Sequence, residues 1–324
     1  MENKELLKNK ILECLESKRG GFCSGEELAE LFSVSRSAVW KAVKNLKAEG
    51  YNVKSVTNRG YCLDTDNDLL SVAAITNFLK NKEFSLQVLR SATSTNDIVK
   101  KLAESGAEEW TVVISEEQTA GRGRYNRAFY SPSGEGVYFS VLLRPEFSAA
   151  ETLYITTSAA VAVCEAIESL SNKKAQIKWV NDVLIEGKKT CGILTEASFD
   201  VENGKIKYAV VGIGINVKQE LFPNELKNIA TSVFGTEYRP GMRSELIAAV
   251  LDKLKYYYDK IPQRAFFEEY KRRSVVIGKR VKVVSGNLNG YAQIIDLNEN
   301  CFLKARFDDG SERLLSSGEV SVKF

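Results

Sequence analysis

The stretch SGEELAELFSVSRSAVWKAVKNLKAEGYNVKSVTNRGYCL (residues 24–63) decides the fold of the N-terminal part of the chain. Ser24 is followed three residues later by Glu27, which is the capping-box pattern that begins a short helix. After a brief turn, Ser35 can cap a second helix, and Gly50 is suited to end it. The stretch therefore begins with two helices joined by a tight turn.

A further helix precedes this pair and a hairpin follows it. Residues 4–16 place Leu7 and Ile11 at helical spacing. Residues 51–63 alternate between apolar and polar side chains around a turn at Asn58-Arg59-Gly60, which is typical of a β-hairpin. Three helices followed by a hairpin predict a winged helix-turn-helix.

Charge is unevenly distributed within this predicted domain. Residues 1–35 carry five Lys or Arg against seven Glu, whereas residues 36–62 carry six Lys or Arg against one Glu. A basic segment of this kind is a candidate nucleic-acid contact. The side chains predicted to meet DNA are Arg36, Ser37, Lys41, Lys44 and Arg59. The alternative is a small helical interaction domain with solvated lysines. Trp40 could face DNA or pack beneath the hairpin, and we expect packing, because a large aromatic side chain usually serves a core.

Composition limits the class of protein. The 324 residues are 44% hydrophobic and 27% charged, with a net charge of +3, which suits a globular chain of two or three domains. The six cysteines form no C-x-x-C pair and favour buried thiols in a reducing compartment. No apolar run looks long enough to cross a membrane, and the N-terminus is too polar for a signal peptide, so we expect a cytoplasmic protein without a membrane partner.

The chain contains no histidine. Catalysis by Ser-His-Asp or Cys-His arrangements and metal binding through histidine are therefore excluded. No pattern in the sequence identifies which residues would bind a metal ion.

Beyond a polar linker at residues 64–68, helical and strand patterns alternate. Helices are expected over residues 70–80, 96–104 and 153–170, and a last helical region over 242–270 that ends near Arg273. Strands are expected over residues 111–116, 136–143, 176–179, 182–185, 192–198 and 208–217, with turns at 186–187 and 203–204. This pattern predicts an α+β domain with a mixed or mostly antiparallel sheet.

Residues 275–324 contain short alternating strands and predict a small β-barrel of the SH3-like kind. We therefore expect three domains. They are a winged helix-turn-helix at 1–66, a mixed α/β catalytic domain at 67–273 and an SH3-like domain at 274–324.

The segment QTAGRGRYNR (residues 118–127) follows a predicted strand and holds three arginines and two glycines within seven residues. Glycines let backbone amides approach an anion closely, and guanidinium groups neutralise phosphate or carboxylate. The segment predicts an anion-binding loop. An exposed basic loop or a second nucleic-acid contact is the alternative.

The segment KWVND (residues 178–182) lies between two predicted strands. A lysine, an amide and a carboxylate at a strand junction suit a site where one anion attacks another. We expect Trp179 to be a core residue, and Asp182 could instead cap a turn. Residues 212–216, GIGIN, lack the third glycine and the following helix of a dinucleotide-binding motif, so they predict a strand that lets a ligand approach through its glycines.

Five segments in this order and spacing resemble those of biotin–protein ligases: Ser94-Thr95-Asn96, GRGRYNR (121–127), KWVND (178–182), KKTCGILTE (188–196) and GIGIN (212–216). The winged helix in front resembles the bifunctional class, in which the ligase also represses biotin operons. The resemblance covers essentially all three predicted domains.

The resemblance assigns roles to matching positions. The biotin-binding residues it implies are Ser94, Thr95, Asn96, Gln118, Arg122, Gly123, Arg124 and Lys178. The nucleotide-binding residues it implies are Arg124, Arg127, Phe129, Asn181 and Asn216. Lys178 would lie between the biotin carboxylate and the α-phosphate and act catalytically with Arg122 and Arg124, and Phe129 would stack on adenine.

Two positions depart from the family pattern. Asn126 stands where the family usually has glycine, and Val180 stands where it usually has proline. Asparagine tolerates a left-handed backbone better than other non-glycine residues, so we expect the loop to keep its shape. We expect Val180 to change backbone stiffness rather than chemistry.

The implied activity uses biotin, ATP and Mg²⁺ to form biotinyl-5'-AMP and transfers biotin to a lysine of a biotin carboxyl carrier domain. Asp182 is a candidate to accept the proton of the attacking amine. The adenylate would act as corepressor, favouring a homodimer that binds operator DNA. The alternatives are a lipoate or octanoyl ligase, a metabolite-sensing repressor with an inactive ligase domain, and an enzyme that acts on nucleic acids.

Overall fold

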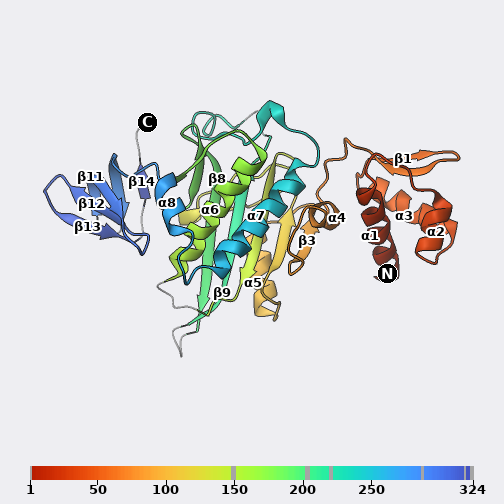
Figure 1. Cartoon of the computed structure of the whole chain (residues 1–324), viewed down its shortest axis with the longest axis horizontal. Helices are drawn as coiled ribbons and strands as arrows, with labels where there is room; N and C mark the ends of the chain where they lie inside the picture. Colours follow the sequence, from red (N-terminus) through yellow and green to blue (C-terminus); the bar gives the residue numbers. More distant parts are fainter. Residues whose placement is uncertain are drawn as a thin grey trace. The chain divides into compact units, whose positions relative to one another are not determined.

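The computed structural model describes residues 2–146, 151–200, 205–218, 222–285, 288–316 and 319–321. The chain divides into two compact units, one of residues 1–80 with 238–248 and the other of residues 81–237 with 249–324 (Figure 1). The three predicted domain limits stay predictions. The turn expected at 203–204 lies outside the described residues.

The first unit is a winged helix-turn-helix, as predicted (Figure 1). Its elements are α1 (Glu2–Ser17), α2 (Gly25–Leu31), α3 (Arg36–Ala48), β1 (Val53–Val56) and β2 (Gly60–Leu63). The expected capping box is present, because Ser24 accepts from the backbone of Glu27 and its own backbone donates to the Glu27 side chain. The turn of the hairpin contains Asn58 at φ 63° and Gly60 at φ 97°. The sequence pattern thus predicted the three helices and the hairpin of the winged helix-turn-helix.

The buried side of α3 is the one that periodicity predicts. Val39, Ala42, Val43 and Leu46 are buried and pack with residues of α1, α2 and the hairpin. This stripe leaves the basic side chains of α3 on the exposed face.

The segment at residues 64–68 is more than a polar linker. Asn67 is buried, and its side-chain oxygen accepts from the backbone of Asn52 at 3.1 Å. Asp68 accepts from the Tyr238 hydroxyl and from the Gly241 backbone within the same unit. The helix expected next is also shorter than predicted, because α4 covers only Val72–Thr76.

The second unit is built on a seven-stranded sheet of order β3-β4-β5-β9-β8-β7-β6. The strands are β3 (Ser85–Leu89), β4 (Thr111–Ser115), β5 (Gly136–Leu143), β6 (Ala175–Lys178), β7 (Asp182–Ile185), β8 (Lys188–Phe199) and β9 (Ile206–Asn216). Only the β3–β4 pair is parallel within this sheet, which confirms the expected mixed, mostly antiparallel topology. The sequence pattern did not predict β3.

Helices α5 (Thr95–Glu104) and α6 (Thr152–Leu170) cover opposite faces of this sheet. Thr156 of α6 bonds to Thr195, whereas Asn96 of α5 bonds to the next residue, Glu196. Successive side chains of a strand point to opposite faces, so the two helices lie on different sides. The face covered by α5 is the one that carries the candidate site.

Helix α6 corrects one expectation from the sequence. Among the described helices it alone is long and apolar enough, by length and composition, to cross a membrane, whereas we expected no such segment. Within that window, 72% of the residues are buried inside the protein, because α6 packs against β6, β7 and β8. A buried core helix meets the same criteria of length and hydropathy.

The last helical region is two helices rather than one, α7 (Met242–Asp259) and α8 (Phe267–Arg273). An antiparallel five-stranded sheet of order β13-β12-β11-β10-β14 follows. Its strands are β10 (Arg280–Ser285), β11 (Leu288–Leu297), β12 (Leu303–Phe307), β13 (Glu312–Leu315) and β14 (Glu319–Ser321). No pairing of β13 with β14 closes a barrel among the described residues, so the sheet is shown and the SH3-like barrel is not. All six cysteines are free thiols, and five of them are buried.

Candidate functional site

A cavity of about 900 Å³ opens on the α5 face of the seven-stranded sheet. It brings together most of the residues that the sequence assigned to a site. Those that line it are Ser94, Thr95, Asn96, Gln118, Arg122, Gly123, Arg124, Arg127, Phe129, Lys178 and Asn181. They come from the start of α5, the arginine–glycine loop and the β6–β7 junction, so three distant segments converge on one cavity.

The floor of the cavity is polar and tightly bonded. The side-chain oxygen of Gln118 accepts from both the backbone and the hydroxyl of Thr95, at 2.9 and 3.2 Å. Ser140 of β5 lies beneath them, with its hydroxyl 2.7 Å from the Thr95 hydroxyl and 2.6 Å from the Asn96 side-chain oxygen. These bonds hold each group in one orientation, as the specific recognition of a polar ligand requires.

A carboxylate that was not among the predicted site residues completes this network. Glu196 of β8 accepts from Asn96 at 2.7 Å and pairs with Lys100 of α5. Burial raises the pKa of Glu196, but the hydrogen bonds from Lys100 and Asn96 outweigh it and leave the pKa below its ordinary value. The carboxylate therefore stays ionised and anchors the Asn96 amide. Ser140 was missed as well, because its role depends on pairing between distant strands.

The glycines of the GIGIN strand make room for side chains of the protein itself. A Cβ on Gly212 would lie 2.2 Å from the Asn96 side-chain oxygen, and one on Gly214 would lie 2.4 Å from the ring of Phe129. We expected these glycines to admit a ligand. Both do line the cavity, but the close approach is made by Asn96 and by Phe129.

The arginine–glycine loop folds back on itself. Arg122 and Ala128 form an isolated antiparallel β-bridge, and the Phe129 backbone amide donates to the Gly121 carbonyl at 2.8 Å. A Cβ on Gly121 would meet the Phe129 carbonyl oxygen at 2.6 Å, so only glycine fits there. Asn126 adopts φ 56°, the left-handed conformation that we expected asparagine to tolerate in place of glycine.

Two arginines of the loop already contact acceptors at the cavity. Arg122 forms an ion pair with Asp97 in the first turn of α5, and both side chains are partly exposed. Arg124 donates to the side-chain oxygen of Asn181 at 3.2 Å, which links the loop to the KWVND segment. An anionic ligand would compete with Asp97 for the guanidinium of Arg122.

Three lysines line the cavity, Lys178, Lys188 and Lys189, and only Lys178 was among the predicted site residues. Lys178 ends β6, and within the part of the chain that the structure describes its ammonium group makes no hydrogen bond or ion pair. Lys189, on β8, pairs with Asp182 at 2.6 Å and lies 6.0 Å from the centre of the Phe129 ring. The signal for Lys189 was its place in the KKTCGILTE segment, but only pairing with β7 brings it to Asp182.

Three further positions from the predicted segments are Trp179, Val180 and Asn216. Trp179 is buried and donates to the Cys301 backbone, as expected of a core residue. The peptide bond before Val180 is cis. Asn216 is not among the described residues that line the cavity; it donates to the Thr231 backbone at 3.2 Å. Its role as a nucleotide contact stays a prediction.

The candidate DNA-binding residues lie on the exposed side of the winged helix. Arg36, Ser37, Lys41 and Lys44 are exposed on α3, and Arg59 is exposed in the hairpin turn. The guanidinium of Arg59 lies over Phe22, 4.0 Å from the ring centre.

The prediction that Trp40 packs beneath the hairpin is wrong. Its side chain is 51% exposed, and Lys44 lies over its ring at 5.3 Å. Trp40 is one helical turn from both Arg36 and Lys44, so it shares their face rather than that of the buried stripe.

Comparison with known proteins decides the family. Residues 8–62 match the HTH domain family, and residues 88–216 match the biotin/lipoate A/B protein ligase family. The bifunctional ligase/repressor BirA of Bacillus spizizenii is 33% identical over 321 residues, which are 96% of this chain and 97% of that protein. The chain belongs to the bifunctional biotin ligase/repressor family.

Other relatives agree with this membership. The bifunctional ligase/repressor BirA of Escherichia coli is 27% identical over 94% of each chain. The biotin protein ligase of Aquifex aeolicus, solved in complex with biotin and ATP, is 29% identical, with a TM-score of 0.62 over 73% of this chain and 97% of that one. Membership in the bifunctional biotin ligase/repressor family confirms the predicted combination of a ligase with a DNA-binding repressor.

Proposed function

We propose that the protein joins biotin to ATP, forms biotinyl-5'-AMP, and transfers biotin to a lysine of a biotin carboxyl carrier domain. One observation carries this proposal. A single cavity of about 900 Å³ combines a rigid polar floor at Thr95 and Gln118 with a positive rim at Arg122, Arg124 and Lys178. Such a cavity suits an uncharged ring head at its floor and two anionic groups at its rim.

The first step joins two anions. The biotin carboxylate attacks the α-phosphorus of ATP, a new oxygen–phosphorus bond forms, and pyrophosphate leaves. The carboxylate is already ionised at neutral pH, so the step needs no general base and no histidine. Lys178, Lys189 and the loop arginines supply the positive charge, and positioning supplies the rest.

The side chains divide between the two parts of the adenylate. In this proposal Ser94, Thr95, Asn96 and Gln118 receive the biotin head, and Arg122, Gly123 and Arg124 close over the acyl phosphate. Arg127, Phe129 and Asn181 then take the nucleotide. The support for this division is that the Phe129 ring and the Lys189 ammonium group lie together at the cavity, whereas the Gln118 side-chain oxygen is bonded to Thr95.

Mg²⁺ fits this site only as a partner of the ATP phosphates. The described residues contain no group of three or more acidic or sulfur side chains that could hold a metal ion. Mg²⁺ commonly binds through one or two carboxylates together with substrate phosphates. We therefore propose that it arrives with ATP and neutralises the departing pyrophosphate.

The second step moves biotin to the carrier. The ε-amine of the carrier lysine attacks the mixed anhydride, a nitrogen–carbon bond forms, the bond to phosphate oxygen breaks, and AMP leaves. The amine must lose a proton. Asp182 stays our candidate to orient or accept it, although its carboxylate already pairs with Lys189.

Exchange of pyrophosphate into ATP tests the enzymatic proposal. We expect exchange that depends on biotin and not on lipoate, and retained biotinyl-5'-AMP in the mass spectrum after incubation with biotin and MgATP. Exchange driven by lipoate would favour the lipoate or octanoyl ligase. DNA binding without any exchange would favour a repressor with an inactive ligase domain.

We further propose that the adenylate, by ordering the arginine–glycine loop, favours a homodimer that presents two winged helices to a two-fold operator. We also propose that the protein works in the reducing cytoplasm, because its six cysteines are free thiols. Gel-shift and sedimentation measurements with and without biotin and MgATP test the coupling. Equal operator affinity and equal mass in both conditions would contradict it.

Replacing Lys41 with alanine is expected to weaken operator binding and to reduce the slope of log K against log salt by about 1, because one phosphate contact is lost. The probe is a duplex selected from a random library by the adenylate-bound protein. Lys10→Ala, which removes an exposed lysine of α1 outside the basic segment, is the matched control. An unchanged salt slope for Lys41→Ala would remove that residue from the DNA interface.

A further inference from the structure

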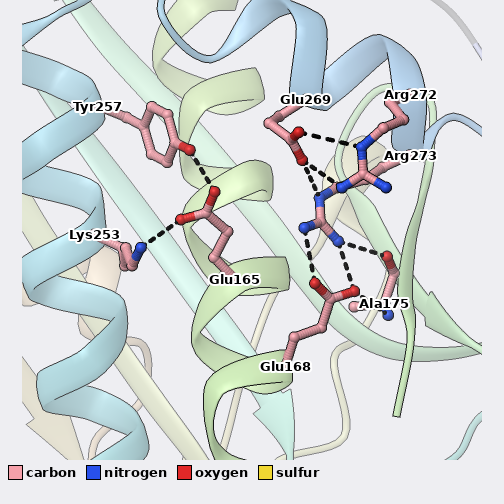
Figure 2. A network of polar contacts seen from close by, with 8 residues as sticks. All are labelled: Glu165, Glu168, Ala175, Lys253, Tyr257, Glu269, Arg272 and Arg273. Atoms are coloured by element: carbon pink, nitrogen blue, oxygen red, sulfur yellow. Dashed lines mark hydrogen bonds and ion pairs between the residues drawn. The ribbon is translucent and has the colours of Figure 1, made fainter. Parts of the chain in front are cut away.

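Strand β6, which ends at Lys178, is bonded at its first residue, Ala175, to side chains of α6 and α8. The Ala175 amide donates to Glu168 of α6 at 3.0 Å, and Arg273 of α8 donates to the Ala175 carbonyl at 3.1 Å. Figure 2 shows the two side chains meeting at Ala175, with Glu269 and Arg272 beside them. Both polar backbone groups at the start of β6 are therefore bonded to one side-chain pair.

That pair is a bidentate ion pair with little freedom. Arg273 contacts the two carboxylate oxygens of Glu168 at 2.7 and 2.8 Å and reaches Glu269 at 3.2 Å. Its side chain is only 5% exposed. Two parallel bonds from a buried guanidinium to a partly exposed carboxylate define the position of α8 against α6 and β6.

Further along the same segment, three more bonds reach β6 and the residues that follow it. The Val275 backbone donates to Ile177 at 2.9 Å, and the Trp179 indole donates to the Cys301 carbonyl at 3.0 Å. The hydroxyl of Tyr270, a buried residue of α8, donates to the Val180 carbonyl at 2.9 Å. Residues 175–180 thus have bonded anchors at four of their six positions.

Residues between and directly after these bonded positions line the cavity. Lys178 and Asn181 both line it. Asn181 accepts from Arg124 and donates to the Ile193 backbone at 2.8 Å, so its amide orients a loop arginine. A change in the peptide group at Val180 passes directly to Asn181, because the two residues share that peptide bond.

We propose that Tyr270, together with the Arg273–Glu168 pair, is a positioning residue that sets Lys178 and Asn181 for adenylate formation. The inference deepens the proposed function and rests on it. Tyr270 touches no substrate. It acts through the Val180 carbonyl, and reacting groups displaced by about 1 Å can lose rate on the order of a hundredfold.

The test compares two phenylalanine substitutions. Tyr270→Phe removes only the hydroxyl bonded to Val180. Tyr257→Phe removes a hydroxyl from another buried tyrosine, which donates to the Glu165 carboxylate at 2.5 Å and lies outside β6 (Figure 2). Glu165 keeps its bond to Lys253, so the control variant leaves no carboxylate unpaired. The measurements are kcat and KM in biotin-dependent ATP–pyrophosphate exchange, together with the melting temperature, all on the full chain.

For Tyr270→Phe we expect kcat to fall about 5–50-fold with an unchanged KM for biotin, because the biotin floor at Thr95 and Gln118 belongs to other segments. Tyr257→Phe should keep kcat within twofold at a similar loss of melting temperature. Equal loss of kcat in both variants, or an unchanged kcat in Tyr270→Phe, would overturn the inference. A wild-type chain without biotin-dependent exchange would instead overturn the proposed function.

Discussion

Alanine at position 189 is expected to slow biotin-dependent ATP–pyrophosphate exchange by about 10²–10³-fold, and alanine at position 178 to have an effect of the same order. Each substitution removes a preorganised positive charge from the rim where carboxylate and phosphate meet. Lys189→Ala also leaves Asp182 without its ion-pair partner at 2.6 Å, which adds negative charge next to two anionic substrates.

The two lysine variants also identify which ammonium serves the reaction. A loss confined to Lys189→Ala would place the reacting groups near Phe129, and a loss confined to Lys178→Ala would place them at the β6 end. Lys207→Ala, an exposed lysine of β9, is the control and should retain the wild-type rate. Wild-type exchange by both cavity variants would contradict charge neutralisation by these lysines.

Gly212→Ala is expected to destabilise the protein by about 1–3 kcal/mol and to weaken biotin binding at least tenfold. The added Cβ would lie 2.2 Å from the Asn96 side-chain oxygen. Asn96 has no free direction in which to yield, because Ser140 and Glu196 hold its amide from two sides. The overlap therefore moves either the strand or the polar floor.

Gly290→Ala is the matched control for this substitution, since it also replaces a strand glycine but its nearest contact would be an ordinary 3.7 Å to Phe307. Thermal unfolding and isothermal titration with biotin measure the two effects. A Gly212→Ala protein with the wild-type melting temperature and biotin affinity would contradict this prediction. It would show that Asn96 can move aside despite its hydrogen bonds.

Several features could be read from the sequence because they depend on neighbours along the chain. The capping box at Ser24 and Glu27, the buried stripe of α3 and the left-handed Asn126 all follow from local chemistry. Trp40 could have been placed from the same information. Its helical spacing from Arg36 and Lys44 indicates the exposed face, but we weighed residue type above periodicity.

Other expectations failed where a local pattern has more than one tertiary outcome. The apolar composition of α6 is equally suited to a core and to a membrane, and only its packing on β6–β8 distinguishes them. Residues 242–270 are helical in composition, yet the chain turns between α7 and α8, and α8 then brings Tyr270 and Arg273 to β6.

The sequence indicated a ligase through five short segments whose order and spacing match a family. Their charges and glycines are local properties, so they can be read without the structure. Which groups meet was decided only by the tertiary structure. Glu196 reaches Asn96, and Lys189 reaches Asp182, because β8 pairs with β7 and lies under α5. Such contacts join residues far apart in the chain, and strand register, which no single segment encodes, determines them.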